Sequence, residues 1–252
     1  MMNWTPGRIE NYKQASEYTS FHKKLAVMAE PYLDSEWTLA DIGCGPGLLA
    51  LQLAPMVYSV DAIDNDSIAI EDLKKHLDGD VAARDRRTAE KIWPRLASIE
   101  DVKYESWDVV TLSFFGLDEE VLNTALSLAE QRAFIYMHGR PDAEGPIASY
   151  DDGNKFSMAD MEEYLQIENL IYKKNVIEMQ FGQPFREISD IQRFLMEYRV
   201  RLETQGAGNN LQDSIERRFA DIEERIIQTN RLDYPYYLPK SVSVALFIIK
   251  TK

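Results

Sequence analysis

The sequence predicts an α/β fold built on a doubly wound, mostly parallel β-sheet. Two observations carry this prediction: a strand–turn–helix pattern at residues 38–54, and the alternation of apolar strand runs with helical patterns after it. The first expected elements are a strand at Trp37–Ile42, a helix at Leu48–Met56, a strand at Val57–Ile63, and a helix at Ser67–Leu77 ended by Gly79 in a C-cap position. Strands joined through helices run parallel, and such sheets bind ligands at their carboxyl edge.

The turn after the first strand has the composition of a ligand-binding loop. It contains Asp41, Gly43, Cys44, Gly45, Pro46 and Gly47. Glycine serves where the backbone needs a positive φ or must approach a ligand closely, and the following helix offers unpaired N–H groups. The second strand ends at Asp64. A dinucleotide-binding fingerprint also has an acid about 20 residues after its turn, but its spacing is G-x-G-x-x-G.

The turn and Asp64 resemble the first two motifs of the class I S-adenosylmethionine-dependent methyltransferases. The resemblance implies S-adenosylmethionine as cofactor and a Rossmann-like, seven-stranded sheet whose last strand is antiparallel. The turn, from Asp41 through Gly43, Cys44 and Gly45 to Gly47, would face the amino-acid end of the cofactor. Asp64, next to Asn65, would bind the ribose hydroxyls. Cys44 could be a nucleophile, but the family often carries a small packing cysteine there, and we favour packing.

The N-terminal region, residues 1–35, is predicted to be helical. Aromatic and aliphatic residues recur at near-helical intervals between Arg8 and Pro31, which indicates one or two helices. The resemblance implies a cap that closes over the cofactor, with Tyr12 or Tyr18 near its carboxylate. The alternative is that these aromatic residues pack on the sheet.

Residues 80–105 show one long helical pattern and no clear third strand. In the family, the loop after the third strand holds the adenine, often through an Asp beside an aromatic residue. Here Trp93 follows Ile92, so Trp93 would stack on the adenine and Glu100 or Asp101 would supply the acid. The alternative is a core Trp93 and two surface acids.

The run Trp107–Phe115 is predicted to be a strand and resembles the family's fourth motif. Ser113 would then face the methyl donor, and Phe115 the acceptor. The Asn/Asp-Pro-Pro-Tyr/Phe signature of amino-group methylation on nucleic acids and glutamine is absent, so no acceptor group can be named.

A helix at Asp118–Gln131 and a strand at Arg132–Met137 lead to a polar loop that runs to about Asn154. His138 is the candidate general base, because an imidazole with a pKa of about 6.5 can remove a proton at neutral pH. Arg140 could bind an anionic substrate. Both residues could equally be structural or solvated, as residues at the end of a strand often are.

The C-terminal part is predicted to hold a helix near Ser157–Ile167 and two strands, Leu170–Phe181 and Ser241–Lys250, which pair antiparallel at the sheet end in this family. Residues 182–240 between the strands contain two helical patterns. This insertion is expected to be a substrate-selecting lid, or else a dimerisation element. Tyr236 could line the acceptor pocket or simply pack.

Composition bounds the remaining possibilities. The chain has 252 residues, 45% of them hydrophobic, one cysteine and a net charge of −14. We expect one methyltransferase domain, a cytoplasmic location and no bound metal, since no apolar stretch approaches a membrane span and the N-terminus lacks signal-peptide features. The negative charge disfavours nucleic acid as a partner.

The predicted function is direct methyl transfer to a small-molecule substrate. Two alternatives stay open: a regulatory protein that binds the cofactor without turnover, and an NAD-dependent oxidoreductase. A homodimer is an open alternative to a monomer.

Overall fold

The centre of the molecule is a seven-stranded sheet. A computed structural model describes residues 4–139, 156–205 and 220–251. The strand order is β3-β2-β1-β4-β5-β10-β6. The strands are β1 (Thr38–Ile42), β2 (Ser59–Asp64), β3 (Ile92–Leu96), β4 (Trp107–Ser113), β5 (Ala129–His138), β6 (Tyr172–Gln180) and β10 (Ser241–Lys250). β1 to β5 pair in parallel, whereas β10 is antiparallel to both β5 and β6, so the predicted doubly wound sheet with an antiparallel last strand is confirmed.

The chain leaves β1 toward β2 on one side and returns to β4 on the other, which makes β1 and β4 the switch point of the sheet. Loops diverge there, and a crevice opens at the carboxyl ends of the two strands. The topology therefore directs the turn after β1 and the loop after β4 into the same space.

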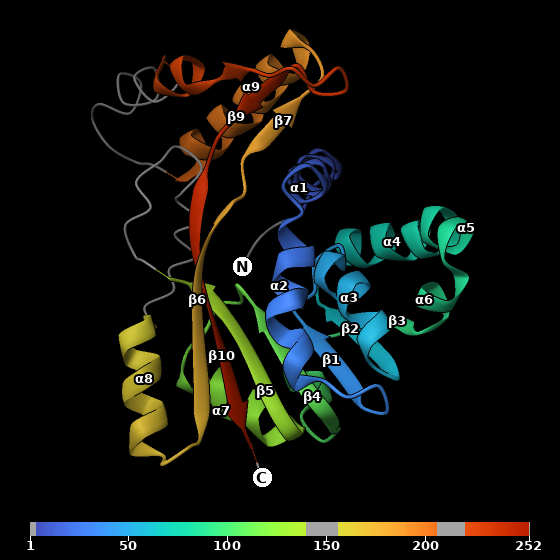
Figure 1. Cartoon of the computed structure of the whole chain (residues 1–252), viewed down its shortest axis with the longest axis vertical. Helices are drawn as coiled ribbons and strands as arrows, with labels where there is room; N and C mark the ends of the chain where they lie inside the picture. The colour runs from blue at the N-terminus through green and yellow to red at the C-terminus, as the bar shows by residue number, and fades with distance from the viewer. Residues whose placement is uncertain (1–3, 140–155, 206–219, 252) are drawn as a thin grey trace.

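Helices cover both faces of the sheet (Figure 1). The helices described include α1 (Pro6–Thr19), α2 (Phe21–Ala29), α3 (Leu48–Leu53), α4 (Ser67–His76), α5 (Ala82–Arg84), α6 (Arg86–Glu90), α7 (Glu119–Leu128), α8 (Met158–Ile167) and, in the insertion away from this sheet, α9 (Ile188–Gln205). α2 and α3 pack on one face, α7 and α8 on the other. None of the helices in these described ranges is long and apolar enough to cross a bilayer.

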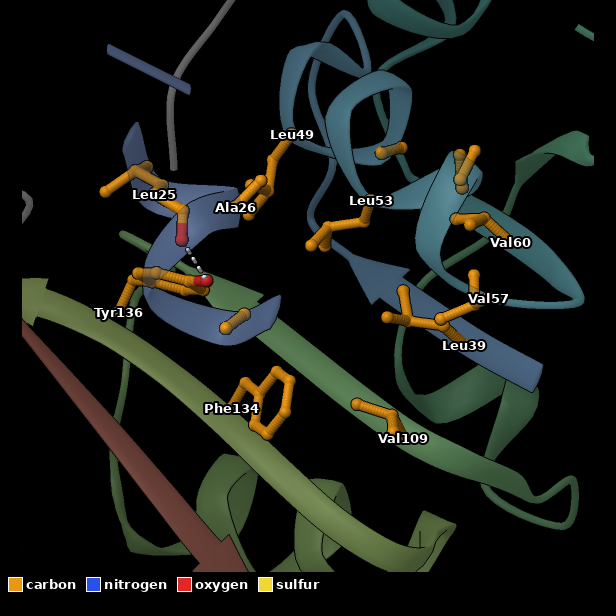
Figure 2. Close-up of a cluster of buried hydrophobic side chains, with 14 of the residues drawn as sticks. Leu25, Ala26, Leu39, Leu49, Leu53, Val57, Val60, Val109, Phe134 and Tyr136 are labelled. Carbon is orange, nitrogen blue, oxygen red and sulfur yellow. Dashed lines mark hydrogen bonds between the residues drawn. The ribbon is translucent and has the colours of Figure 1, made fainter. Parts of the chain in front are cut away.

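The core under α2 and α3 ties the N-terminal helices to the sheet (Figure 2). Leu25 on α2 faces Phe134 and Tyr136 on β5, and the Tyr136 hydroxyl donates a 2.9 Å hydrogen bond to the Leu25 carbonyl oxygen. Burying each such side chain contributes about 1.5–3 kcal/mol. α2 is therefore part of the core.

The break between α1 and α2 lies at Ser20, which adopts a left-handed conformation with φ 54°. Its backbone N–H caps α1 by donating to carbonyl oxygens of the last turn, and α2 starts at the next residue. The region predicted as one or two helices is thus two helices, folded back at Ser20.

Two local predictions were wrong. The expected helical stretch at 80–105 contains strand β3, an edge strand that holds Pro94 and pairs with β2. Proline is tolerated at an edge and masks the strand pattern. Gly79 does not cap α4, because the chain continues into a π-helical turn at Leu77–Val81.

The insertion contains α9, as its first helical pattern predicted, and also a small sheet that was not predicted. This sheet has the order β7-β9-β8, formed by Gln183–Phe185, Tyr236–Leu238 and Ile227–Gln228. Residues 220–225 are helical, whereas the start of the second predicted pattern, at 211 and 215, lies outside the described residues.

Candidate functional site

A cavity of about 360 Å³ opens at the carboxyl ends of β1, β2 and β4, beneath the N-terminal helices. Its lining residues are Trp4, Tyr12, His22, Asp41, Ile42, Gly43, Cys44, Gly45, Leu49, Asp64, Asn65, Ala97, Ser98, Ile99, Glu100, Ser113, Phe114, Phe115, Gly116 and Val121. The topology thus brings the turn after β1, the end of β2 and the loop after β4 into one site.

The turn after β1 needs its glycines for two physical reasons. Gly43, Gly45 and Gly47 have φ values of 74°, 53° and 73°, a region that strains other residues. A Cβ at Gly43 would overlap the ring of Phe115, and one at Gly45 would lie 2.8 Å from the Trp4 ring. Gly47 does not line the cavity but is the N-cap of α3.

Asp64 connects the turn after β1 to the start of α4. Its Oδ2 accepts a 2.7 Å hydrogen bond from the Gly45 N–H, and its Oδ1 accepts one of 2.8 Å from the Asp66 N–H. Burial raises the pKa of Asp64, although these N–H groups oppose the shift. Each carboxylate oxygen keeps further lone-pair capacity, so Asp64 can accept hydrogen bonds from ligand hydroxyls.

Asp41 is a buried carboxylate at the floor of the cavity, with 1% of its surface exposed. Among the described residues, neither of its oxygens has a hydrogen-bond partner. Burial, and then the charge of Asp64, raise its pKa to about 7, while the N–H of Ala50 in the first turn of α3 acts in the opposite direction. Such an orphaned carboxylate is costly unless a ligand supplies a positive partner.

The cavity is negatively charged. Asp41, Asp64 and Glu100 line it, and its lining includes no lysine or arginine among the described residues. The histidine of the lining, His22, is neutral at physiological pH because burial lowers its pKa to about 3. Its two ring nitrogens are 2.9 Å from the Tyr12 hydroxyl and 2.6 Å from the Ser16 hydroxyl. The site therefore favours a cationic ligand.

No protein-family model matches the chain, and no curated protein matches it in sequence. Solved structures match its fold. A Bacillus halodurans protein assigned as a methyltransferase aligns over 92% of this chain and 99% of its own, with a TM-score of 0.56 and 11% identity. A cyclopropane-fatty-acyl-phospholipid synthase-like protein from Lactobacillus casei covers 99% of this chain and 95% of its own, with a TM-score of 0.54 and 12% identity. The chain has the class I methyltransferase fold.

A third solved structure, a Pyrococcus horikoshii protein assigned as an RNA methyltransferase, covers 92% of this chain and 84% of its own, with a TM-score of 0.51 and 11% identity. At these identities the likeness concerns the fold of the methyltransferase core. The roles of individual residues rest on the geometry of the site.

The loop after β4 forms the wall of the cavity nearest to β5. Phe114 has φ 51°, a strained conformation for a bulky residue, and Ser113 and Phe115 line the cavity beside it. The His138 ring lies 4.8 Å from the Phe114 ring, centre to centre. His138 is outside the cavity lining and its side chain is exposed at one edge; partial burial, and then the charge of Lys240, lower its pKa.

Besides Gly47 and His138, three predicted site residues lie away from the cavity. Trp93 is 61% exposed on the outer edge strand, because the expected loop there is β3. Tyr18 packs against the insertion, with its ring stacked 4.7 Å from that of Tyr237. Tyr236 packs on the small core of the insertion, beside Phe185. Arg140 lies outside the described residues.

Several lining residues were missed by sequence reasoning. Trp4 precedes the Thr5-Pro6 start of α1, and its N–H donates a 3.0 Å hydrogen bond to Oδ2 of Asp66, which no local pattern reveals. His22 reaches the cavity because the chain folds back at Ser20. Of the two acids proposed after the third strand, Glu100 lines the cavity, whereas Asp101 accepts hydrogen bonds from Ser98.

Proposed function

We propose that this protein is an S-adenosylmethionine-dependent methyltransferase. The observation that carries the proposal is Asp41, a buried carboxylate on the floor of an acidic cavity that, among the described residues, has no cationic partner and no hydrogen bond of ordinary geometry. S-adenosylmethionine carries an ammonium and a sulfonium group, and Coulomb attraction to Asp41 offsets the desolvation of the carboxylate.

The residues of the cavity fit the other parts of this cofactor. Asp64 would hold the ribose hydroxyls with the lone pairs that Gly45 and Asp66 leave free. The glycine turn lets the methionine portion approach the backbone, and residues 97–100 after β3 would lie along the adenine. Trp4 and Tyr12 close the site from the N-terminal side.

The bound sulfonium would supply an activated methyl group for direct displacement. The chain's own residues then align the acceptor and exclude water: Phe114 and Phe115 form an apolar wall beside Ser113. His138, neutral because its pKa is lowered, would take the proton of the acceptor on a ring nitrogen.

The geometry disfavours a dinucleotide. Dinucleotide-binding folds place a pyrophosphate at the helix N-terminus that follows the glycine turn. Here the Asp41 carboxylate faces the first turn of α3 near Ala50, so a pyrophosphate would meet a buried acid. A regulatory protein without turnover would keep the same cavity, and only an activity measurement separates it from an enzyme.

We propose a small molecule as acceptor. The chain carries a net charge of −14, which weakens binding to a phosphate backbone. The Pyrococcus horikoshii structure assigned to RNA shares the fold, so RNA is the second acceptor class to test.

Calorimetric titration tests cofactor binding. We expect micromolar affinity for S-adenosylmethionine and S-adenosylhomocysteine, and no binding of NAD. Asp64→Asn should weaken binding at least tenfold, because a hydrogen bond to a charged group contributes about 1.5–3 kcal/mol. Asp34→Asn, which removes an exposed carboxylate outside the cavity, is the matched control. Preference for NAD would contradict the proposal.

Transfer of label tests turnover and acceptor class. The protein is incubated with S-adenosylmethionine labelled in the methyl group, together with either a small-molecule cell extract or total RNA. We expect label in the small-molecule fraction and none in RNA. Label in RNA would reject the acceptor class, and cofactor binding without any transfer would favour the regulatory alternative.

A further inference from the structure

Helix α1 lies between the methyltransferase core and the insertion. Figure 1 shows it beside β7, above the helices that cover β1 and β2. A backbone–side-chain hydrogen bond, an ion pair and a small apolar cluster fix it to α4, and ring contacts fix its other end to the insertion. A helix held on both sides can transmit a displacement from one to the other.

The core side of α1 belongs to the cavity. The Trp4 N–H binds Asp66, Lys13 forms a 2.6 Å ion pair with Asp72 on α4, and Tyr12 lies 5.3 Å from the Trp4 ring. Trp4 is buried and lies against Gly45, the residue whose N–H binds Asp64. The position of α1 therefore sets how the N-terminal side of the cavity closes.

The insertion side of α1 is centred on Tyr18. Its ring stacks on Tyr237 of β9 at 4.7 Å and an interplanar angle of 28°, and meets Tyr234 edge-on at 5.7 Å. The Arg231 guanidinium lies 4.5 Å from the Tyr18 ring centre and is itself fixed by a 2.7 Å ion pair to Asp233.

A second contact joins α1 to the insertion near the other end of the helix. The Glu197 carboxylate on α9 lies against Gly7 and accepts a 3.4 Å hydrogen bond from the Asn11 amide. Tyr18 and Glu197 thus hold the helix at two points about three turns apart. Neither residue lines the cavity.

We propose that Tyr18 is a positioning residue for the cofactor site: its stack on Tyr237 holds α1 so that Trp4 and Tyr12 close over the ligand. This inference rests on the proposed function. It gives the insertion a role besides any contact with the acceptor, because a displacement of β9 would move α1 and with it the residues that close the cofactor site. Alanine at position 18 would remove both the ring stack and the cation–π contact, whereas phenylalanine would keep both.

The test measures S-adenosylhomocysteine affinity by calorimetry and hydrogen exchange of residues 6–19 in the ligand-free protein. Tyr18→Ala and Tyr237→Ala should each raise the Kd about tenfold and speed exchange in α1, and the double variant should be no worse than either single one. Tyr18→Phe should restore wild-type values. Leu232→Ala, at a fully exposed position of the insertion, is the control and should change neither quantity.

The outcomes separate this inference from the proposed function. An unchanged Kd and unchanged exchange in Tyr18→Ala, or a Tyr18→Phe protein that behaves like Tyr18→Ala, would overturn the positioning role. If Tyr18→Ala fails to fold, Arg231→Ala removes the cation–π contact to Tyr18 together with the ion pair to Asp233, leaves the Tyr18–Tyr237 stack in place, and should raise the Kd about threefold. If the wild type does not bind the ligand, the proposed function fails, while exchange in α1 still reports whether Tyr18 holds the helix.

Discussion

Asp41 lowers the stability of the ligand-free protein, a cost that the proposed cofactor would offset on binding. Its carboxylate is buried with no hydrogen-bond partner of ordinary geometry in the described part of the chain, and its pKa rises from the ordinary value of about 3.8 to about 7. The folded, ligand-free protein therefore holds a proton that the unfolded chain has released over this interval. Stability falls as the pH rises from about 4 to 7, and the loss is complete above that range.

We predict that Asp41→Asn stabilises the ligand-free protein at pH 8 by up to about 4 kcal/mol, because three pKa units correspond to about 1.4 kcal/mol each. At pH 4 the carboxyl group is protonated in the folded state and about 40% protonated in the unfolded chain, so the pKa shift costs less than about 1 kcal/mol and the variant should differ little from the wild type. Urea denaturation at the two pH values measures the difference. A variant that is less stable at pH 8 would show that Asp41 has a structural partner.

The individual residues of the site differ in how well the sequence predicts them. Asp41 and Asp64 end apolar strand runs beside a glycine turn, so local pattern alone places them at the carboxyl edge of the sheet. His22 reaches the cavity because the chain folds back at the left-handed Ser20. Trp4 reaches it because its N–H donates a long-range hydrogen bond to Asp66. Those contacts have no local signature, and sequence reasoning missed both residues.

At the scale of elements, the glycine turn is the least tolerant segment of the site. Gly43 has a positive φ, and a Cβ there would overlap Phe115. We predict that Gly43→Ala destabilises the protein by more than about 1 kcal/mol and abolishes cofactor binding. Thermal unfolding and titration with S-adenosylhomocysteine measure the two effects.

Gly79 provides the matched control for this prediction. It has an ordinary φ, and a Cβ there would meet no atom within 4 Å. Gly79→Ala should therefore be neutral or slightly stabilising and should leave binding unchanged. Equal behaviour of the two alanine variants would show that the turn is not built as described.

Strands with a long apolar run could be predicted from the sequence, and short strands could not. Strand β10 has eight consecutive buried residues between two exposed ends and was predicted with its observed bounds. Strand β3 has one buried residue and contains Pro94, and β7, β8 and β9 have only two or three residues each. Strands this short form because tertiary contacts pair them with neighbouring strands, and a local sequence pattern does not indicate such pairing.

At the scale of the whole molecule, the fold places acidic groups at the switch point of the sheet and encloses them with aromatic side chains from three segments. The cavity selects ligands by charge, because Asp41, Asp64 and Glu100 have no cationic residue beside them in its described lining. Proton release on ligand binding therefore reports the ionisation of Asp41. A cation that pairs with Asp41 must displace the proton held there.

The most direct test of this claim is calorimetric titration with S-adenosylmethionine at pH 7 in two buffers of different ionisation enthalpy. With a pKa of about 7, Asp41 is about half protonated, so binding should release about half a proton in the wild type. This release should be absent in Asp41→Asn, which should also bind more weakly. Equal proton release by the two proteins, or tighter binding of NAD than of S-adenosylmethionine, would contradict the account.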